Sequence, residues 1–154
     1  MTRLPVAIDS NLLLLLVVGM TEKEYVSKHK RLQAFTLSDY DLLQEQLTVA
    51  TEIVVTPNTL TETSNLIDHI GDPARSRIYS KLRELVDLPE TREIYVDSRA
   101  ASGRTELPRL GLTDCALLEV CAAGTLLITV DIKLFLAAFG HGNKALNFNH
   151  LRSL

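Results

Sequence analysis

Short apolar runs alternate along the chain with longer segments in which apolar residues recur at helical spacing. The runs predict strands at about residues 5–8, 52–55, 93–96 and 126–130, with a closing edge strand at 145–148. The longer segments predict helices at about residues 11–19, 21–35, 39–48, 57–70, 73–86, 114–123 and 132–139, and one beginning near 98. This alternation is typical of a parallel sheet covered by helices on both faces. We therefore expect one α/β domain over residues 1–154, with about five strands.

Several predicted helices begin at recognisable capping residues. Thr21 and Glu24 form a T-x-x-E pattern that predicts a capping box for a helix reaching about residue 35. Thr56 followed by Pro57 predicts another start, because threonine caps helices and proline suits their first turn. Further starts are predicted at Ser38, at Asp72 with Pro73, and at Thr113.

The composition is that of an ordinary globular protein with an aliphatic core. Hydrophobic residues make up 46% of the chain and charged residues 23%, whereas aromatic residues make up only 5% and tryptophan is absent. The formal net charge of −3 excludes a general coat of lysine and arginine, so any contact with nucleic acid must be local. Cys115 and Cys121 lie on one predicted helix, with Cα atoms about 9 Å apart. That separation is too long for a disulfide, and we predict buried free thiols.

The apolar run from Leu12 to Met20 has the length of a signal-peptide core. However, Asp9 precedes it and no small-residue cleavage site follows. The run is also too short to span a membrane. We therefore predict a buried helix, no membrane contact and a cytoplasmic location.

Acidic side chains stand where strands give way to loops or helices, and these are the candidate catalytic residues. Alone, each fits a helix cap or a helix first turn, where the dipole favours an acid. Together they converge on the carboxyl ends of the strands, where functional groups of parallel sheets collect. Like charges so close would repel one another unless cations occupied the site. The four acids are Asp9, Glu62, Asp114 and Asp131.

Carboxylate ligands favour hard divalent ions, so the acids predict a site for Mg²⁺ or Mn²⁺. The four histidines and two cysteines show no zinc-like spacing. Such a site would activate a bound water for attack on a phosphodiester. Short polar side chains beside the acids either orient them and their waters or simply cap helices. These are Ser10, Asn11, Thr113 and Thr129.

Two basic clusters and one apolar cluster each have two interpretations. The basic residues fit solvated helix faces, which we favour, or a phosphate-binding rim around the acids. The apolar residues fit the core, which we favour, or a surface for a partner. The basic clusters are Lys23, Lys28, Lys30 and Arg31, and Arg75, Arg77, Lys81 and Arg83. The apolar cluster is Leu32, Phe35, Leu42, Leu43 and Leu47.

Four segments of the sequence resemble the PIN-domain family, most closely its VapC-type toxins. They are AIDSN, VTPNTLTETSNLI, GLTDCALLE and LLITVDIKL, followed by a closing ALNFNHL. Their order and spacing match the family over nearly the whole chain. The resemblance implies a three-layer α/β/α fold with a parallel sheet in the order 3-2-1-4-5. By position, the four acids match the acidic quartet of the family, Asn11 matches a polar residue of its first motif, and Thr113 and Thr129 match threonines beside its third and fourth acids.

The resemblance also implies an activity and partners. It implies cleavage of RNA that depends on Mg²⁺ or Mn²⁺, a homodimer, and an antitoxin protein that fills the acidic groove with a basic side chain. An alternative is a non-catalytic PIN-like module that binds RNA or protein. A phosphoaspartate enzyme is disfavoured because Asn11, not a second aspartate, stands two residues after Asp9. The glycine pattern of dinucleotide-binding proteins is absent.

Overall fold

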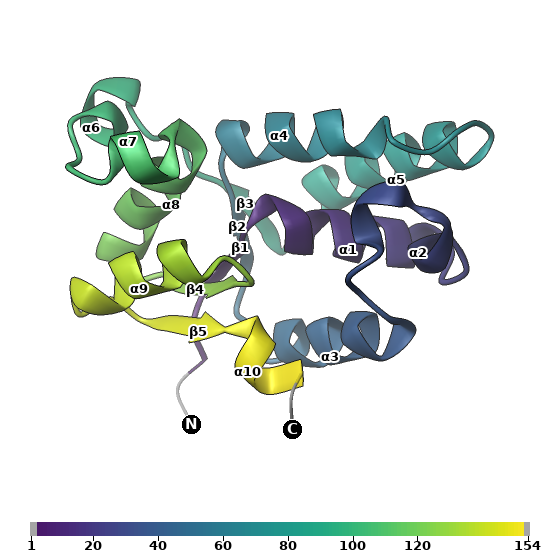
Figure 1. The fold of residues 1–154 in the computed structure, drawn as a ribbon, viewed down its shortest axis with the longest axis horizontal. Coiled ribbons are helices and arrows are strands. Elements are labelled where there is room, and N and C mark those ends of the chain that lie inside the picture. The colour runs from purple at the N-terminus through teal and green to yellow at the C-terminus, as the bar shows by residue number, and fades with distance from the viewer. Residues whose placement is uncertain (1–2, 153–154) are drawn as a thin grey trace.

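A computed structural model describes residues 3–152 of the chain. Its centre is a sheet of five parallel strands in the order β3-β2-β1-β4-β5. The strands are β1 (Val6–Ile8), β2 (Ile53–Val55), β3 (Thr91–Glu93), β4 (Leu126–Thr129) and β5 (Ala145–Asn147). Both the predicted fold class and the predicted strand order are confirmed, including the position of the last strand at an edge (Figure 1).

Helices connect the strands and cover the sheet. They are α1 (Ser10–Thr21), α2 (Tyr25–Lys28), the 3₁₀ helix η1 (Lys30–Leu32), α3 (Leu37–Thr48), α4 (Pro57–Ile67), α5 (Ala74–Asp87), α6 (Ser98–Ser102), α7 (Leu107–Leu110), α8 (Leu112–Ala122), α9 (Ile132–Gly140) and α10 (Phe148–Arg152). From the sheet, α1 and α4 run to one side of the molecule, while α8 and α9 lie on the other (Figure 1).

Alternating strand residues divide the core into two layers. Val6 and Ile8 of β1 belong to a cluster that includes the buried side chains of α1. Ala7, between them, faces a second cluster with residues of α8 and α9. This division follows from the pleat, which points successive side chains to opposite faces of a sheet. The result is a sheet between two helical layers.

Helix α1 is apolar around nearly its whole circumference, and its burial explains this. Its residues from Leu12 to Val18 are all buried, and the helix contacts α3, α4 and α5. The run that resembles a signal-peptide core is therefore a buried helix, as predicted. Among residues 3–152, no helix is long and apolar enough to cross a membrane. The predicted core role of the apolar cluster is also confirmed, because Leu32 and Leu43 are fully buried.

The prediction of a helix from Thr21 to about residue 35 is wrong. Helix α1 continues through Thr21, whose hydroxyl donates to Val17 O at 2.7 Å, and Glu24 makes no side-chain capping bond. The buried face of α1 thus prevails over the local capping pattern. The segment that follows is broken at His29, whose extended backbone separates α2 from η1.

Other boundaries differ from the prediction by one to three residues. Helix α3 is capped by Thr36, not Ser38, through a reciprocal capping box with Asp39. Strand β3 ends at Glu93, before the apolar residues that suggested it at 93–96. Two of those apolar residues, Ile94 and Val96, pack partly buried on the core beyond the strand, and Ile94 N still donates to Val55 O of β2 at 2.8 Å. Cys115 and Cys121 are buried and free, as predicted.

Candidate functional site

The predicted acids stand at the carboxyl ends of the strands. Asp9 directly follows β1, and Asp131 follows the neighbouring strand β4. Glu62 lies on α4 and Asp114 in the first turn of α8, and these two helices contact each other. In Figure 1, the starts of α1, α4, α8 and α9 gather near the middle of the molecule.

Asp9 is the most firmly held of the four acids. Its side chain caps α1, with Oδ1 accepting from Leu12 N at 3.0 Å. Oδ2 accepts from Val130 N at 3.0 Å and from the hydroxyl of Thr129. Asp9 is only 5% exposed, and burial raises its pKa although these hydrogen bonds oppose the shift. The carboxylate is therefore fixed in orientation and destabilised in its charged form.

Thr129 links Asp9 to Asp131. The Thr129 hydroxyl donates to Asp9, and its oxygen accepts from Asp131 N at 2.9 Å. Asp131 in turn caps α9, because its Oδ1 accepts from the backbone N–H groups of Lys133 (2.9 Å) and Leu134 (3.2 Å). Within residues 3–152, the other oxygen of Asp131 accepts no hydrogen bond. Asp131 can therefore cap α9 with Oδ1 and still offer its other oxygen to a ligand.

Asp114 has the clearest electrostatic signature of the site. Burial is the main cause that raises its pKa to about 7. The negative charges of the other acids add to the shift, in decreasing order Asp131, Asp9 and Glu62. Asp114 is therefore close enough to the other three acids for their charges to raise its pKa.

Glu62 lies at the exposed rim. It lines a polar pocket of about 350 Å³, and Thr113 lines the same pocket from α8. Thr113 does not cap α8, which was the prediction, because the helix begins at Leu112, two residues earlier than predicted, with Gly111 as its N-cap. The positive φ of 84° at Gly111 lets the chain turn sharply from α7 into α8.

The two polar residues after Asp9 differ in environment. Ser10 is buried, and its Oγ has no hydrogen-bond partner in the described part of the chain. An unpaired buried hydroxyl is costly, so it is available to a water or ligand. Asn11 is exposed on the surface of α1.

The structure does not hold these acids as a ready-made ligand cage. Among residues 3–152, no group of three or more His, Cys, Asp and Glu side chains is placed so as to hold a metal ion. The acids interact through their charges while both oxygens of Asp9 accept hydrogen bonds from the protein. Ligation by all four side chains would therefore require small rotations of the exposed ones.

Residues of the chain end support the site, and the sequence prediction missed them. Asn147 ends β5, is buried, and accepts from Asn149 N at 3.0 Å through Oδ1. Asn149 Nδ2 donates to Val130 O at 2.9 Å, next to Asp131. The sequence signal for them was a pair of asparagines at and just after the end of the last strand. Polar groups there lie at the same end of the sheet as the acids.

The predicted basic clusters lie away from the acids. They occupy α2, η1 and α5, on the side of the molecule opposite to α8 and α9 (Figure 1). Arg77 donates to Glu22 at 2.8 Å, and Lys81 pairs with Glu84 at 2.8 Å. These contacts agree with solvated helix faces, the interpretation we favoured.

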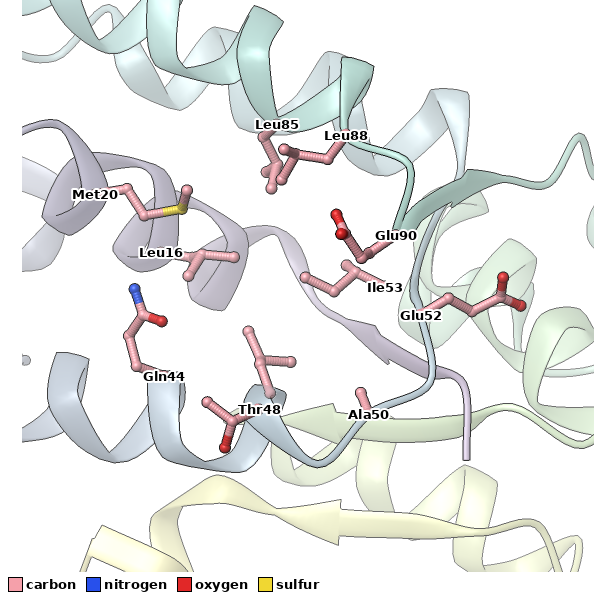
Figure 2. Close-up of a pocket in the computed structure, with 11 residues that line it drawn as sticks. Leu16, Met20, Gln44, Thr48, Ala50, Glu52, Ile53, Leu85, Leu88 and Glu90 are labelled. Carbon is pink, nitrogen blue, oxygen red and sulfur yellow. The ribbon is translucent and has the colours of Figure 1, made fainter. Parts of the chain in front are cut away.

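A separate apolar pocket of about 290 Å³ opens near the amino ends of β2 and β3. Figure 2 shows Leu16, Met20 and Leu85 around it, while Glu52 points away. Glu52 pairs with Arg92 at 2.8 Å. Because the acids follow the opposite ends of the strands, this pocket is not part of the acidic site.

Comparisons with protein-family models, with curated proteins and with solved structures found no match for this chain. The candidate site is therefore interpreted from its own residues.

Proposed function

We propose that this protein is a metal-dependent endoribonuclease of PIN-like type. The observation that carries the proposal is the electrostatic coupling of carboxylates from four separate chain segments at one edge of the sheet. Such repulsion opposes folding, and a protein keeps it where a cation compensates it. The strand order agrees with the fold that the resemblance to PIN domains implies.

The chemistry of the donor set fits Mg²⁺ or Mn²⁺. All four acids offer oxygen ligands, and the partnerless Ser10 hydroxyl adds a polar group beside Asp9. A bound divalent ion would lower the pKa of a coordinated water and stabilise the charge that develops on the phosphodiester. Asp9, Asp114 and Asp131 are the residues that would hold it, with Glu62 at the open side.

The residues of the chain prepare the site for this reaction. Thr129 fixes the carboxylate of Asp9, and the backbone of α9 fixes that of Asp131. Both acids therefore keep their orientation when substrate enters, which reduces the reorganisation needed in the transition state. Asp114 and Glu62 form no side-chain hydrogen bond within residues 3–152 and are free to adjust.

Cleavage of RNA with Mg²⁺ or Mn²⁺ tests the proposal. We expect Asp9→Asn and Asp114→Asn to lose about a hundredfold or more of the activity, and a chelator to abolish it. Asp87→Asn is the matched control, because Asp87 is an exposed acid at the end of α5. Unchanged cleavage in both site variants, or no metal binding by calorimetry, would refute the proposal. RNA binding without cleavage under any divalent metal would favour a non-catalytic module.

We further propose that the protein is the toxin of a toxin–antitoxin pair that acts in the cytoplasm as a homodimer. The support is the resemblance to VapC-type toxins together with an acidic site that a basic side chain of an antitoxin would fit. A small basic protein encoded beside this gene should relieve growth arrest caused by the wild type. Arrest that persists in Asp9→Asn, or the lack of any arrest, would contradict the toxin role.

A further inference from the structure

A third pocket, of about 460 Å³, lies between the segment containing α7 and one face of α9. Its lining is mixed, with basic, acidic and aliphatic groups. The residues are Thr105, Glu106, Arg109, Lys133, Leu136, Ala137, Gly140 and His141. None of them is among the acids of the candidate site.

The pocket presents two cations that the protein leaves unpaired. Arg109 and Lys133 are exposed, and neither side chain has an ion-pair or hydrogen-bond partner within residues 3–152. Arg104, on the same segment, is by contrast paired with Glu119. Arg109 and Lys133 are therefore available to an anion from outside.

The carboxylate in the pocket already has partners within the protein. Glu106 is buried, and its Oε2 lies 2.6 Å from His141 Nε2. Its Oε1 lies 3.4 Å from Arg104 Nε. A paired carboxylate repels an approaching anion far less than a free one. The net character of the pocket is positive.

The pocket adjoins the acidic site through two short stretches of chain. Lys133 stands in the first turn of α9, two residues after Asp131. Arg109 stands in α7, which turns through Gly111 into the helix that carries Asp114. A strand of RNA that extends from the acids towards α7 and the start of α9 would thus meet the pocket.

We propose that this pocket binds a phosphodiester group of single-stranded RNA, with Arg109 and Lys133 as its phosphate ligands. The inference rests on the proposed ribonuclease function and assigns a substrate-positioning role to residues outside the acidic site. Arginine offers a planar fork to two phosphate oxygens, and lysine adds a point charge. Both side chains project from helices, which keeps their spacing fixed relative to the acids.

Binding of a fluorescent single-stranded oligoribonucleotide in the presence of a chelator tests the pocket without cleavage. The test variant is Arg109→Gln with Lys133→Gln, and the control is Lys28→Gln with Arg83→Gln, which removes equal charge from α2 and α5. We expect the test variant to bind about tenfold more weakly or worse at low salt. Its slope of log affinity against log salt should fall by about 0.7, because the pocket contacts one phosphate of the single strand. The control should stay within about twofold of wild type, because its charges are remote.

Competition and turnover separate the remaining outcomes. Inorganic phosphate and a mononucleotide should displace the oligomer far less well than unlabelled RNA. The pocket assignment is wrong if a mononucleotide displaces the oligomer as well as RNA does. It is also wrong if the test and control variants bind RNA equally, or if the wild type does not bind RNA.

If wild type cleaves RNA and the test variant keeps the same KM, the pocket assignment fails while the ribonuclease proposal stands. If the RNA affinity depends on the two cations but no metal supports cleavage, the ribonuclease proposal fails while the pocket stands.

Discussion

The hydroxyl of Thr129 donates a hydrogen bond to Oδ2 of Asp9, across 120 residues of sequence. This bond joins the ends of the two central strands β1 and β4. Because Thr129 also accepts from the backbone of Asp131, one hydroxyl sets the relative position of two acids. The geometry of the candidate site therefore depends on a residue that bears no charge.

Replacing Thr129 with valine should reduce stability and disturb the acids together. The change keeps the shape of the side chain but removes the only side-chain donor to the buried carboxylate of Asp9 within residues 3–152, leaving two backbone donors. We expect a loss of about 1–3 kcal/mol in the free energy of unfolding, measured with urea. Thr129→Ser keeps the hydroxyl and should retain the bond, at the smaller cost of a lost methyl group. A valine variant as stable as wild type would contradict this role.

Gly19 and Gly140 should respond in opposite ways to alanine. A Cβ at Gly19 would lie 2.2 Å from Tyr40 Cδ1, so α1 and α3 could not keep their close packing. We expect Gly19→Ala to destabilise the protein by about 1–3 kcal/mol. Gly140 ends α9 with open space around the added atom, and Gly140→Ala should be neutral or stabilise by up to about 1 kcal/mol. Thermal unfolding of both variants checks the contrast, and equal melting temperatures would contradict it.

Glu106 should make the protein lose stability in acid. Its hydrogen bond with His141 is the main cause that lowers its pKa to about 2, with Arg104 contributing. A lowered folded-state pKa stabilises the fold above the ordinary value of 4.5, and that contribution disappears as the pH falls towards about 2. The wild type should therefore lose up to about 3 kcal/mol of stability relative to Glu106→Gln over this interval. A stability difference between the two proteins that stays constant from pH 6 to about pH 2 would contradict the prediction.

Mn²⁺ should raise the melting temperature through the acidic site. An ion that binds only the folded state adds about 2.7 kcal/mol at a concentration of one hundred times its Kd. We expect the increase in wild type and in Asp87→Asn, whose acid lies at the end of α5. We expect little or none in Asp9→Asn or Asp131→Asn. Equal shifts in all four proteins would show that the ion binds elsewhere.

The predictions succeeded where the pattern of hydrophobic residues alone decided the structure. The buried helix that begins near Leu12 and the α/β class followed from apolar runs and from alternation, whereas the strand order followed from the resemblance to PIN domains. The capping pattern at Thr21 failed because the burial of α1 outweighs a local hydrogen bond. The third strand was misplaced because Ile94 and Val96 pack on the core after the strand has ended, while its own residues Thr91–Glu93 are polar.

The sequence by itself determined the layered α/β fold and the placement of the four acids after strands or early in helices, because hydrophobic periodicity is a local property of the chain. Only the tertiary structure decided how those acids are held. The bond from Thr129 to Asp9, the shifted pKa of Asp114, and the basic pocket beside them arise between residues far apart in the chain. Their energies depend on burial and distance, which no local pattern specifies.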